Sequence, residues 1–403
     1  MMLSVFTRRF LLSAALAGHL AVSGCGGQDG SDAPARTDVD PRDCATVAEA
    51  PIPADADTVA LVADNTASDA GGGLPPAIEE SLREAQRNGQ ILVIVPVEGD
   101  GANPAVQHRI ALDPYTGEDS PRADRARGIV ISCVERWVRA PESQPNSPGS
   151  DILAAIGAAA REQPTTILVI SDGLGTAGGL DVNRHGFDVD PAQLARDAQD
   201  AAEPQLRETS IVWAGLGNST TQLPQALRNS LRTLWTALLT EAGAEVTFDD
   251  RSGAPAPPAD ELPEDPVTVP APVLTPVGCA TKVTLPTSLL FQPGSAQIGA
   301  GTDGELGATA AQLIEHPDWT AEVSGHTAHY GSEEYRRELS IRRARAVVEA
   351  LVEMGVDRRR LTAVGAGSDD PEVDEFPGGV HDESAAAVNR RVVVELLPAG
   401  CDR

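Results

Sequence analysis

Three side chains that could bind a metal ion follow the first apolar run of the folded part of the sequence. In the segment Val62-Ala63-Asp64-Asn65-Thr66-Ala67-Ser68, the carboxylate of Asp64 is followed at alternate positions by the hydroxyls of Thr66 and Ser68. A turn after a strand directs alternate side chains into one pocket, and hard divalent cations prefer oxygen ligands. The spacing therefore indicates a divalent-cation site. The alternative is that Thr66 and Ser68 only cap the turn and the helix that follows.

The elements around this segment alternate between strands and helices. Short apolar runs rich in β-branched residues predict the strands, and amphipathic stretches predict the helices. The strands are expected at Thr58–Asp64, Ile91–Val97, Ile129–Cys133, Thr166–Ser171, Ser210–Gly215 and Glu245–Asp249, and the helices at Leu74–Asn88, Asp151–Glu162, Pro191–Glu203 and Leu223–Ala242. Strands that are apolar throughout are typical of a parallel sheet covered on both faces. Residues 57–250 are thus predicted to form a doubly wound α/β domain with a parallel sheet.

The Asp-x-Thr-x-Ser arrangement resembles the Asp-x-Ser-x-Ser element of von Willebrand factor A domains, where it begins a metal-ion-dependent adhesion site. Two further blocks fall where that family would have them, one around Ser150 at the start of a helix and one containing Asp172 at the end of a strand. The resemblance implies that Ser150 stands for the family's threonine ligand, that the carboxylate of Asp172 either binds the ion directly or supports its direct ligands, and that the ion is Mg²⁺ or Mn²⁺. The whole set would then lie at the sheet edge where open α/β sheets bind ligands.

The loop at this edge, Gly173–Asp190, is long and acidic for its place, with carboxylates at Asp181, Asp188 and Asp190. Long ordered loops beside a site are often functional. A disordered loop is equally compatible with this composition. The sequence leaves both interpretations open.

A proline-rich segment, residues 251–278, separates this domain from a second one. Such a composition favours extended conformers and acts as a semi-rigid spacer. In residues 279–403 the pattern predicts strands at Lys282–Leu290, Thr320–Gly325, Leu361–Gly365 and Arg390–Leu397, and helices at Asp303–His316 and Glu333–Met354. Two helices on one mixed sheet, an α+β sandwich, account for all of these elements.

Residues 279–403 contain five sequence blocks, Phe291–Ala296, Val323–Thr327, Leu339–Ala344, Gly365–Gly367 and Asn389–Val392. In this order they make the segment similar to OmpA-like peptidoglycan-binding domains. The resemblance implies that this domain binds the zwitterionic diaminopimelate of the peptidoglycan stem, with Arg343 as the family's arginine and with Thr327, Asn389 and Arg390 as further binding residues. The alternatives are a solvated helix face for Arg343 and, as the favoured role of Asn389, structural hydrogen bonding.

One residue of the family's charge pair is absent, because Ala328 occupies the position of its carboxylate. A charge-assisted hydrogen bond contributes about 1.5–3 kcal/mol, so its loss weakens binding by roughly 10–100-fold unless another acid replaces it. Glu333, Glu334 and Asp369 are near enough in sequence to be replacements. Otherwise the domain recognises a different stem or serves as a scaffold. Arg336, where the family has asparagine, is a second departure.

The first 25 residues have the pattern of an export signal, with Arg8 and Arg9 before an apolar run from Phe10 to Val22. This run is shorter than the about 20 residues that a transmembrane helix needs. The Val-Ser-Gly-Cys sequence resembles the lipobox of bacterial lipoproteins, which implies lipidation of Cys25 and anchoring to a membrane, the outer one in a cell with two. An ordinary signal peptide is the alternative. Residues 1–24 are thus expected to be a signal peptide and residues 25–56 a disordered tether, with the export route left open.

Four cysteines remain after such processing, Cys44, Cys133, Cys279 and Cys401. An even number of cysteines in an exported chain argues for disulfides. Three pairings are possible, and the pairing of Cys44 with Cys133 and of Cys279 with Cys401 is favoured because each bond then closes within one predicted domain.

The charge balance bears on the class of function. With 31 basic and 59 acidic residues the net charge is −28, which disfavours nucleic-acid binding.

The sequence has no nucleophile-elbow, zinc-protease or phosphate-loop motif, so we predict a non-enzymatic protein. It would tether the membrane to peptidoglycan while its middle domain binds a protein or ligand. The alternatives are a metal-assisted hydrolase using Asp64 and Asp172, and a scaffold of an envelope machine.

Overall fold

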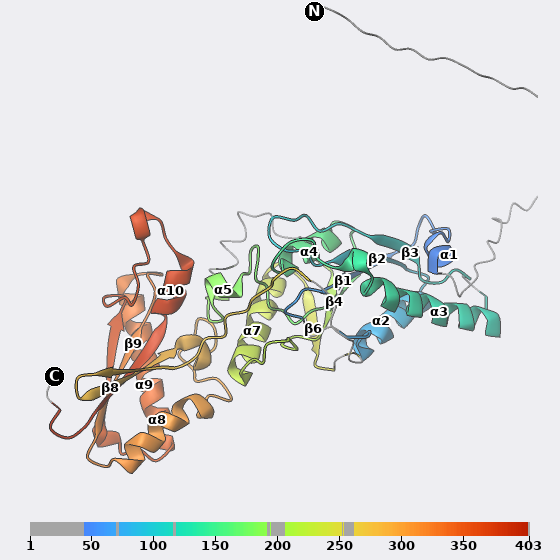
Figure 1. Ribbon diagram of the computed structural model, residues 1–403. Coiled ribbons are helices and arrows are strands. Elements are labelled where there is room, and N and C mark those ends of the chain that lie inside the picture. The colour runs from blue at the N-terminus through green and yellow to red at the C-terminus, as the bar shows by residue number, and fades with distance from the viewer. Residues whose placement is uncertain are drawn as a thin grey trace, which may run out of the picture. The chain divides into compact units, whose positions relative to one another are not determined.

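The computed structural model describes residues 44–69, 72–115, 118–191, 194, 206–251, 253 and 262–401. Two β-sheets organise them, one of six strands and one of five (Figure 1). The predicted signal peptide, Cys25 and residues 25–43 of the predicted tether lie outside the described residues, as does most of the predicted helix Pro191–Glu203. Among the described residues, no helix has both the length and the apolar character needed to cross a bilayer.

The first sheet is mostly parallel. Its strands are β1 (Thr58–Ala63), β2 (Ile91–Pro96), β3 (His108–Ala111), β4 (Thr166–Ile170), β5 (Ser210–Ala214) and β6 (Glu245–Asp249), in the order β3-β2-β1-β4-β5-β6. Only the edge strand β3 runs antiparallel to its neighbour. Because β1 and β4 are central neighbours, their carboxyl ends lie side by side at one edge of the sheet.

Helices cover both faces of this sheet. They are α2 (Pro76–Arg87) and α3 (Pro121–Val138) on one face and α4 (Ile152–Ala160) and α7 (Gln225–Glu241) on the other. Alternate residues of β1 enter the two cores, Leu61 packing with α2 and α3 and Val62 with α4 and α7. Side chains on both sides of a strand are therefore buried, which explains why these strands are apolar throughout.

The predicted strand Ile129–Cys133 is wrong, because these residues lie inside the helix α3. Ser120 caps this helix, its hydroxyl accepting a hydrogen bond from the backbone N–H of Ala123, and Pro121 occupies the first turn. The buried residues recur at helical intervals along α3. The β-branched run was thus misread as a strand, and the edge strand β3 was not predicted.

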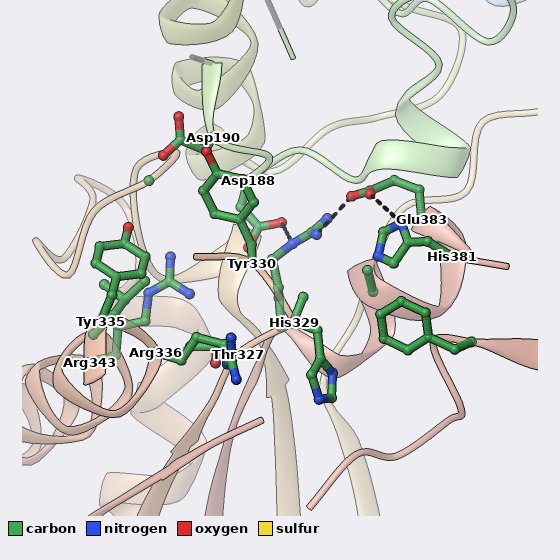
Figure 2. Close-up of a pocket in the computed structure, with 16 residues that line it drawn as sticks. Asp188, Asp190, Thr327, His329, Tyr330, Tyr335, Arg336, Arg343, His381 and Glu383 are labelled. Carbon is green, nitrogen blue, oxygen red and sulfur yellow. Dashed lines mark hydrogen bonds and ion pairs between the residues drawn. The ribbon is translucent and has the colours of Figure 1, made fainter. Parts of the chain in front are cut away.

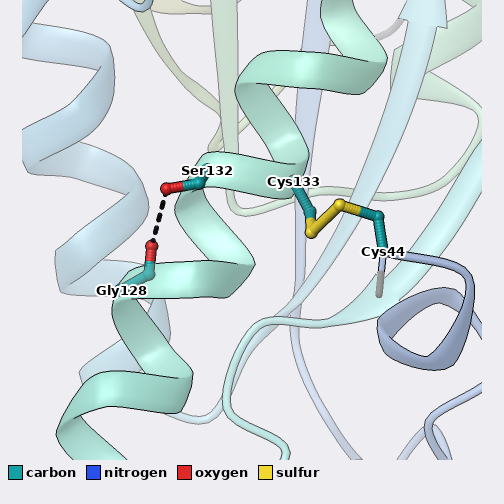
Figure 3. The surroundings of a disulfide bond; sticks show 4 residues. All are labelled: Cys44, Gly128, Ser132 and Cys133. Carbon is teal, nitrogen blue, oxygen red and sulfur yellow. Dashed lines mark hydrogen bonds between the residues drawn. A yellow bond between two sulfur atoms is a disulfide. The ribbon is translucent and has the colours of Figure 1, made fainter. Parts of the chain in front are cut away.

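The folded domain begins earlier than the predicted boundary at residue 57. A short helix, α1 (Cys44–Ala48), packs Val47 into the core beside α3, and the Cys44–Cys133 disulfide joins the two helices (Figure 3). The prediction of a disordered tether is therefore wrong for this part, since burial and a covalent bond hold it. The second disulfide joins Cys279 to Cys401, so both bonds have the favoured pairing.

The second sheet has the order β10-β9-β11-β8-β7. Its strands are β7 (Val273–Val277), β8 (Ala280–Pro286), β9 (Thr320–His326), β10 (Leu361–Gly367) and β11 (Arg391–Leu397), and its helices are α8 (Asp303–Glu315), α9 (Glu333–Glu353) and α10 (Glu383–Asn389). Only β9 and β10 pair in parallel. Apolar residues of α8 and α9 share one core with the sheet, as expected of an α+β sandwich.

A glycine sets the distance between α9 and the second sheet. A Cβ atom at Gly325 would lie 2.2 Å from the backbone oxygen of Ser340, which is closer than two such atoms can approach. Gly325 therefore lets the helix pack directly on β9, and it places Arg343 of α9 near the residues that follow β9.

The prediction that residues 251–278 form a spacer between domains is wrong for the second half of this segment. Val273–Val277 is the strand β7 and pairs with β8. Val267 and Val269 pack against a cluster formed by residues of both domains, including Phe187 and Leu289. The prolines of this segment make it extended, but hydrogen bonds and apolar contacts fix it to the folded domains.

Candidate functional site

The polar residues after β1 form a hydrogen-bonded group. One carboxylate oxygen of Asp64 accepts hydrogen bonds from the hydroxyl of Thr66, at 2.7 Å, and from its backbone N–H, at 3.1 Å. The Thr66 hydroxyl lies 3.3 Å from that of Ser68 and 2.8 Å from that of Ser150. These four predicted ligands are all buried and face one another.

Asp172, which follows β4, is the fifth predicted ligand. Carboxylate oxygens of Asp64, Asp69 and Asp172 all lie within 4.8 Å of one another. The backbone N–H of Leu174 donates to one oxygen of Asp172, whereas the second oxygen of Asp172 is buried without a hydrogen-bond partner among the described residues. The structure thus brings all five predicted ligands to one place, as the pairing of β1 with β4 requires.

Residues that were not predicted complete this group. Ser171 donates a hydrogen bond of 2.7 Å to Asp64, and Asp69 accepts one of 2.9 Å from the backbone of Asp172. Their position next to the predicted ligands could have identified both. The carboxylate of Asp265 also enters the group, accepting from the hydroxyls of Ser68 and Ser150 at 2.6 and 2.5 Å. No sequence signal marked it, because Asp265 belongs to the proline-rich segment.

The electrostatics of this group suit a cation. Burial and the nearby charges of Asp69 and Asp64 raise the pKa of Asp172 well above its usual range. Burial likewise raises the pKa of Asp64, although hydrogen bonds from Ser171 and Thr66 oppose the change. In the described part of the chain, no cationic side chain pairs with Asp64, Asp172 or Asp265. Carboxylate and hydroxyl oxygens with uncompensated negative charge fit Mg²⁺ or Mn²⁺.

The second candidate site is a cavity of about 290 Å³ beside α9. Arg343 and Thr327 line it from the C-terminal domain, and Asp188 and Asp190 line it from the loop of the middle domain (Figure 2). The cavity also has an aromatic part, to which Tyr330, Tyr335 and Phe376 contribute. Basic, acidic and aromatic side chains therefore surround one space.

Arg343 is held rigidly, not solvated. Its side chain is 2% exposed, its Nε donates a hydrogen bond of 2.9 Å to the backbone oxygen of Ser295, and its guanidinium lies 5.3 Å from the centre of the Phe291 ring. Burial lowers the pKa of Arg343, and the charge of Asp188 opposes this change. Both fixed neighbours come from the predicted block Phe291–Ala296, which explains why that block accompanies the arginine.

Thr327 and Ala328 lie at the end of β9, beside Arg343. The backbone N–H of Thr327 donates to the oxygen of Gly367, and the threonine hydroxyl is buried with no hydrogen-bond partner in the part of the chain that the structure describes. Ala328 lines the cavity and offers no polar group. Thr327 is therefore available to a ligand, while the position of the family's carboxylate is apolar.

Asn389 and Arg390 have other partners. The Asn389 side chain is 1% exposed and bonds to the backbone of Glu372 and Val373 and to Glu375, outside the cavity. Arg390 lines the cavity but forms ion pairs with Asp188, at 3.1 Å, and Glu383, at 3.0 Å. The structure gives Asn389 a structural place and makes Arg390 a contact between the two domains.

The carboxylates expected to replace that of the family lie elsewhere. Glu333 and Asp369 form ion pairs with Arg337 on the exposed side of α9, and Glu334 is exposed on the same helix. None of the three lines the cavity. The acidic residues that do so are Asp188, Asp190 and Glu383, two of which belong to the loop Gly173–Asp190 whose role the sequence left open.

Comparison with known proteins agrees with the geometry of the second domain. The model of the OmpA family matches residues 290–382, so the chain has an OmpA-like domain at its C-terminal end. The Legionella pneumophila protein named peptidoglycan-associated lipoprotein is 38% identical over 22% of this chain and 47% of its own length. Outer membrane porin F of Pseudomonas fluorescens is 39% identical over 22% of this chain and 26% of its own length. The chain thus spans less than half of these relatives.

A solved structure with the same kind of name is also similar in part. The peptidoglycan-associated lipoprotein from Burkholderia pseudomallei is 28% identical and covers 28% of this chain and 88% of its own, with a TM-score of 0.25. The matched part is small beside the whole chain, so this likeness adds no argument on function.

Proposed function

We propose that this protein is an envelope lipoprotein that tethers a membrane to the cell wall. Its OmpA-like domain would bind peptidoglycan non-covalently, and Cys25 would carry the lipid. The observation that carries the proposal is the buried Arg343, held by Ser295 beside the unpartnered hydroxyl of Thr327 in an open cavity. A fixed guanidinium with a free hydroxyl next to it is suited to a carboxylate ligand.

The cavity also contains a partner for the ammonium group of a zwitterionic stem. Asp190 lines it, and its carboxylate is close to Gly294, where a Cβ atom would lie 3.3 Å from one oxygen. Asp188, which is paired with Arg390, also lines the cavity from the same loop. We infer that the middle domain supplies the negative charge that Ala328 lacks.

Sedimentation with purified peptidoglycan tests this function. The chain that follows Cys25 is expected to sediment with the polymer, and Arg343→Ala to weaken binding by roughly 10–100-fold, since one charge-assisted interaction is lost. Arg342→Ala is the matched control, because Arg342 is the exposed neighbour on the same helix. Equal sedimentation of the Arg343 variant, with its melting temperature unchanged, would contradict the site; no sedimentation of the unsubstituted chain would favour a scaffold role.

For the middle domain we propose a von Willebrand factor A-like metal site that binds a protein or ligand. The support is the convergence of Asp64, Thr66, Ser68, Ser150 and Asp172, whose oxygens fit a hard divalent cation. Binding a protein or ligand through a metal ion involves no chemical reaction. We propose that the domain is not an enzyme. A calorimetric titration with Mn²⁺ tests the metal-site proposal. One binding site per chain is expected, and a titration without any heat of binding would contradict the proposed metal site.

The lipid anchor is proposed from the sequence around Cys25. Cells grown with a labelled fatty acid should yield a labelled protein, and Cys25→Ser should abolish the label. A labelled Cys25→Ser variant would show that the anchor lies elsewhere.

A further inference from the structure

The carboxylate of Asp265 is bound by the same hydroxyls that form the candidate metal site. One of its oxygens accepts hydrogen bonds from the hydroxyls of Ser68 and Ser150 and lies 3.3 Å from the backbone N–H of Ser68. Its other oxygen accepts from the hydroxyl of Thr176. Asp265 is 9% exposed, although it belongs to a segment between two domains.

Backbone contacts on both sides hold Asp265 in this position. The carbonyl of Glu264 accepts a hydrogen bond of 3.0 Å from the N–H of Gly149, next to Ser150. Asn183 donates 2.8 Å to the carbonyl of Pro266 and accepts 2.7 Å from the N–H of Thr268. The segment is thus fastened at residues 264, 266 and 268, and Asp265 is directed into the site between these points.

Hydroxyls connect Asp265 to the carboxylates after β1 and β4, because Ser68 and Ser150 both contact Thr66, which donates to Asp64. Asp64 and Asp172 have carboxylate oxygens within 4.8 Å of each other. The buried group thus contains the three carboxylates of Asp64, Asp172 and Asp265. Among the described residues none of the three has a cationic partner, and Asp172 keeps one buried oxygen without any partner. Burying a charge is strongly unfavourable unless an opposite charge compensates it. Hydroxyl hydrogen bonds satisfy Asp265 in part, but they bring no positive charge.

We propose that Asp265 is a ligand of the cation in the middle domain, so that the cation fastens the linker to this domain. This inference rests on the proposed metal site. The cation would draw together oxygens from the ends of β1 and β4 and from the linker. An acidic side chain of a partner could reach the cation only by displacing Asp265, so the linker would control access to the site.

Calorimetric titration with Mn²⁺ of the chain that follows Cys25, stripped of metal, tests the proposal. Asp265→Asn keeps the size and the accepting oxygen but removes the charge, and should weaken Mn²⁺ binding by more than about tenfold, since losing even an outer partner of a metal site lowers affinity roughly 10–100-fold. Glu264→Gln is the matched control, because Glu264 is its exposed neighbour and should leave the affinity unchanged.

Hydrogen exchange gives a second measurement that distinguishes the outcomes. Mn²⁺ should slow exchange in residues 262–270 of the unsubstituted chain and have little effect on that segment in Asp265→Asn. If the unsubstituted chain binds no Mn²⁺, the proposed metal site itself fails. If it binds Mn²⁺ and Asp265→Asn binds as tightly or more tightly, the metal site stands and Asp265 is not its ligand.

Discussion

The two candidate sites are assembled in different ways. The candidate metal site draws its predicted residues from one edge of one sheet, where the parallel pairing of β1 and β4 brings Asp64 and Asp172 together. The cavity at Arg343 draws its residues from two domains, with Asp188 and Asp190 facing a helix of the OmpA-like domain. A site within one sheet follows from its strand ends, whereas a site between domains depends on residues that no local pattern connects.

Their charges differ as well. The candidate metal site combines carboxylates and hydroxyls, with no cationic partner among the described residues for Asp64, Asp172 or Asp265. The cavity has a buried guanidinium at Arg343 and a carboxylate at Asp190. The first arrangement is suited to a cation and the second to a zwitterion, so the two sites should respond separately to mutation.

The largest expected effect is at the metal centre. Asp172→Asn should lower Mn²⁺ affinity by more than about 100-fold, because a direct ligand matters more than the outer residues whose loss lowers affinity 10–100-fold. Sedimentation with peptidoglycan should be unchanged. Calorimetry and sedimentation on the same preparation check both statements, and a parallel loss of peptidoglycan binding would show that the sites are not independent.

Acid should destabilise the OmpA-like domain through His326. Burial and the nearby charge of Arg391 lower the pKa of His326 to about 4. The unfolded chain, with an ordinary histidine pKa near 6.5, then binds more protons between these two values, so stability is complete above pH 6.5 and falls as the pH drops toward 4. The free energy of unfolding should decrease by about 2 kcal/mol from pH 7 to pH 5 through this group.

Urea unfolding at the two pH values measures this contribution. His326→Gln should reduce the difference between pH 7 and pH 5, since glutamine does not titrate. An unchanged difference in the variant would assign the pH dependence to other groups.

Within the cavity, Asp190→Asn should weaken peptidoglycan binding by about tenfold, the effect of one lost charge-assisted contact. Asp369→Asn is the matched control, because Asp369 is paired with Arg337 on the exposed side of α9. Sedimentation of both variants compares the acid that the structure places in the cavity with one that the sequence suggested. A larger loss of binding in Asp369→Asn than in Asp190→Asn would instead assign the missing carboxylate to Asp369.

The smallest effect should come from Ala328→Asp. If Asp190 already receives the ammonium group, a second carboxylate at residue 328 should raise the affinity only a few-fold, as little new interaction is gained. A gain of 100-fold would mean instead that the site lacks a negative charge as it stands.

Much of the fold followed from local sequence. Apolar runs located β1, β2, β4, β5 and β6. The residues after β1 and β4 were expected to come together, and they do, because strand ends in a parallel sheet converge. The blocks of the OmpA-like domain located Arg343 and its neighbours. In each case the residues that act together are close in sequence or follow paired strands.

Other features depended on contacts that local sequence does not contain. The run around Ile131 reads as a strand until the cap at Ser120 and the helical spacing of its buried residues are considered. Asp265 lies in a segment whose composition indicates a spacer, and its role follows only from its hydrogen bonds to Ser68 and Ser150. Asp190 belongs to another domain than the arginine it faces.

Binding of the peptide stem is the central claim, and calorimetry with a soluble stem peptide ending in diaminopimelate tests it most directly. We predict that the chain following Cys25 binds one peptide and that Arg343→Ala loses most of this affinity while Arg342→Ala retains it. Absence of binding by the unsubstituted chain, or equal binding by the Arg343 variant, would contradict the account.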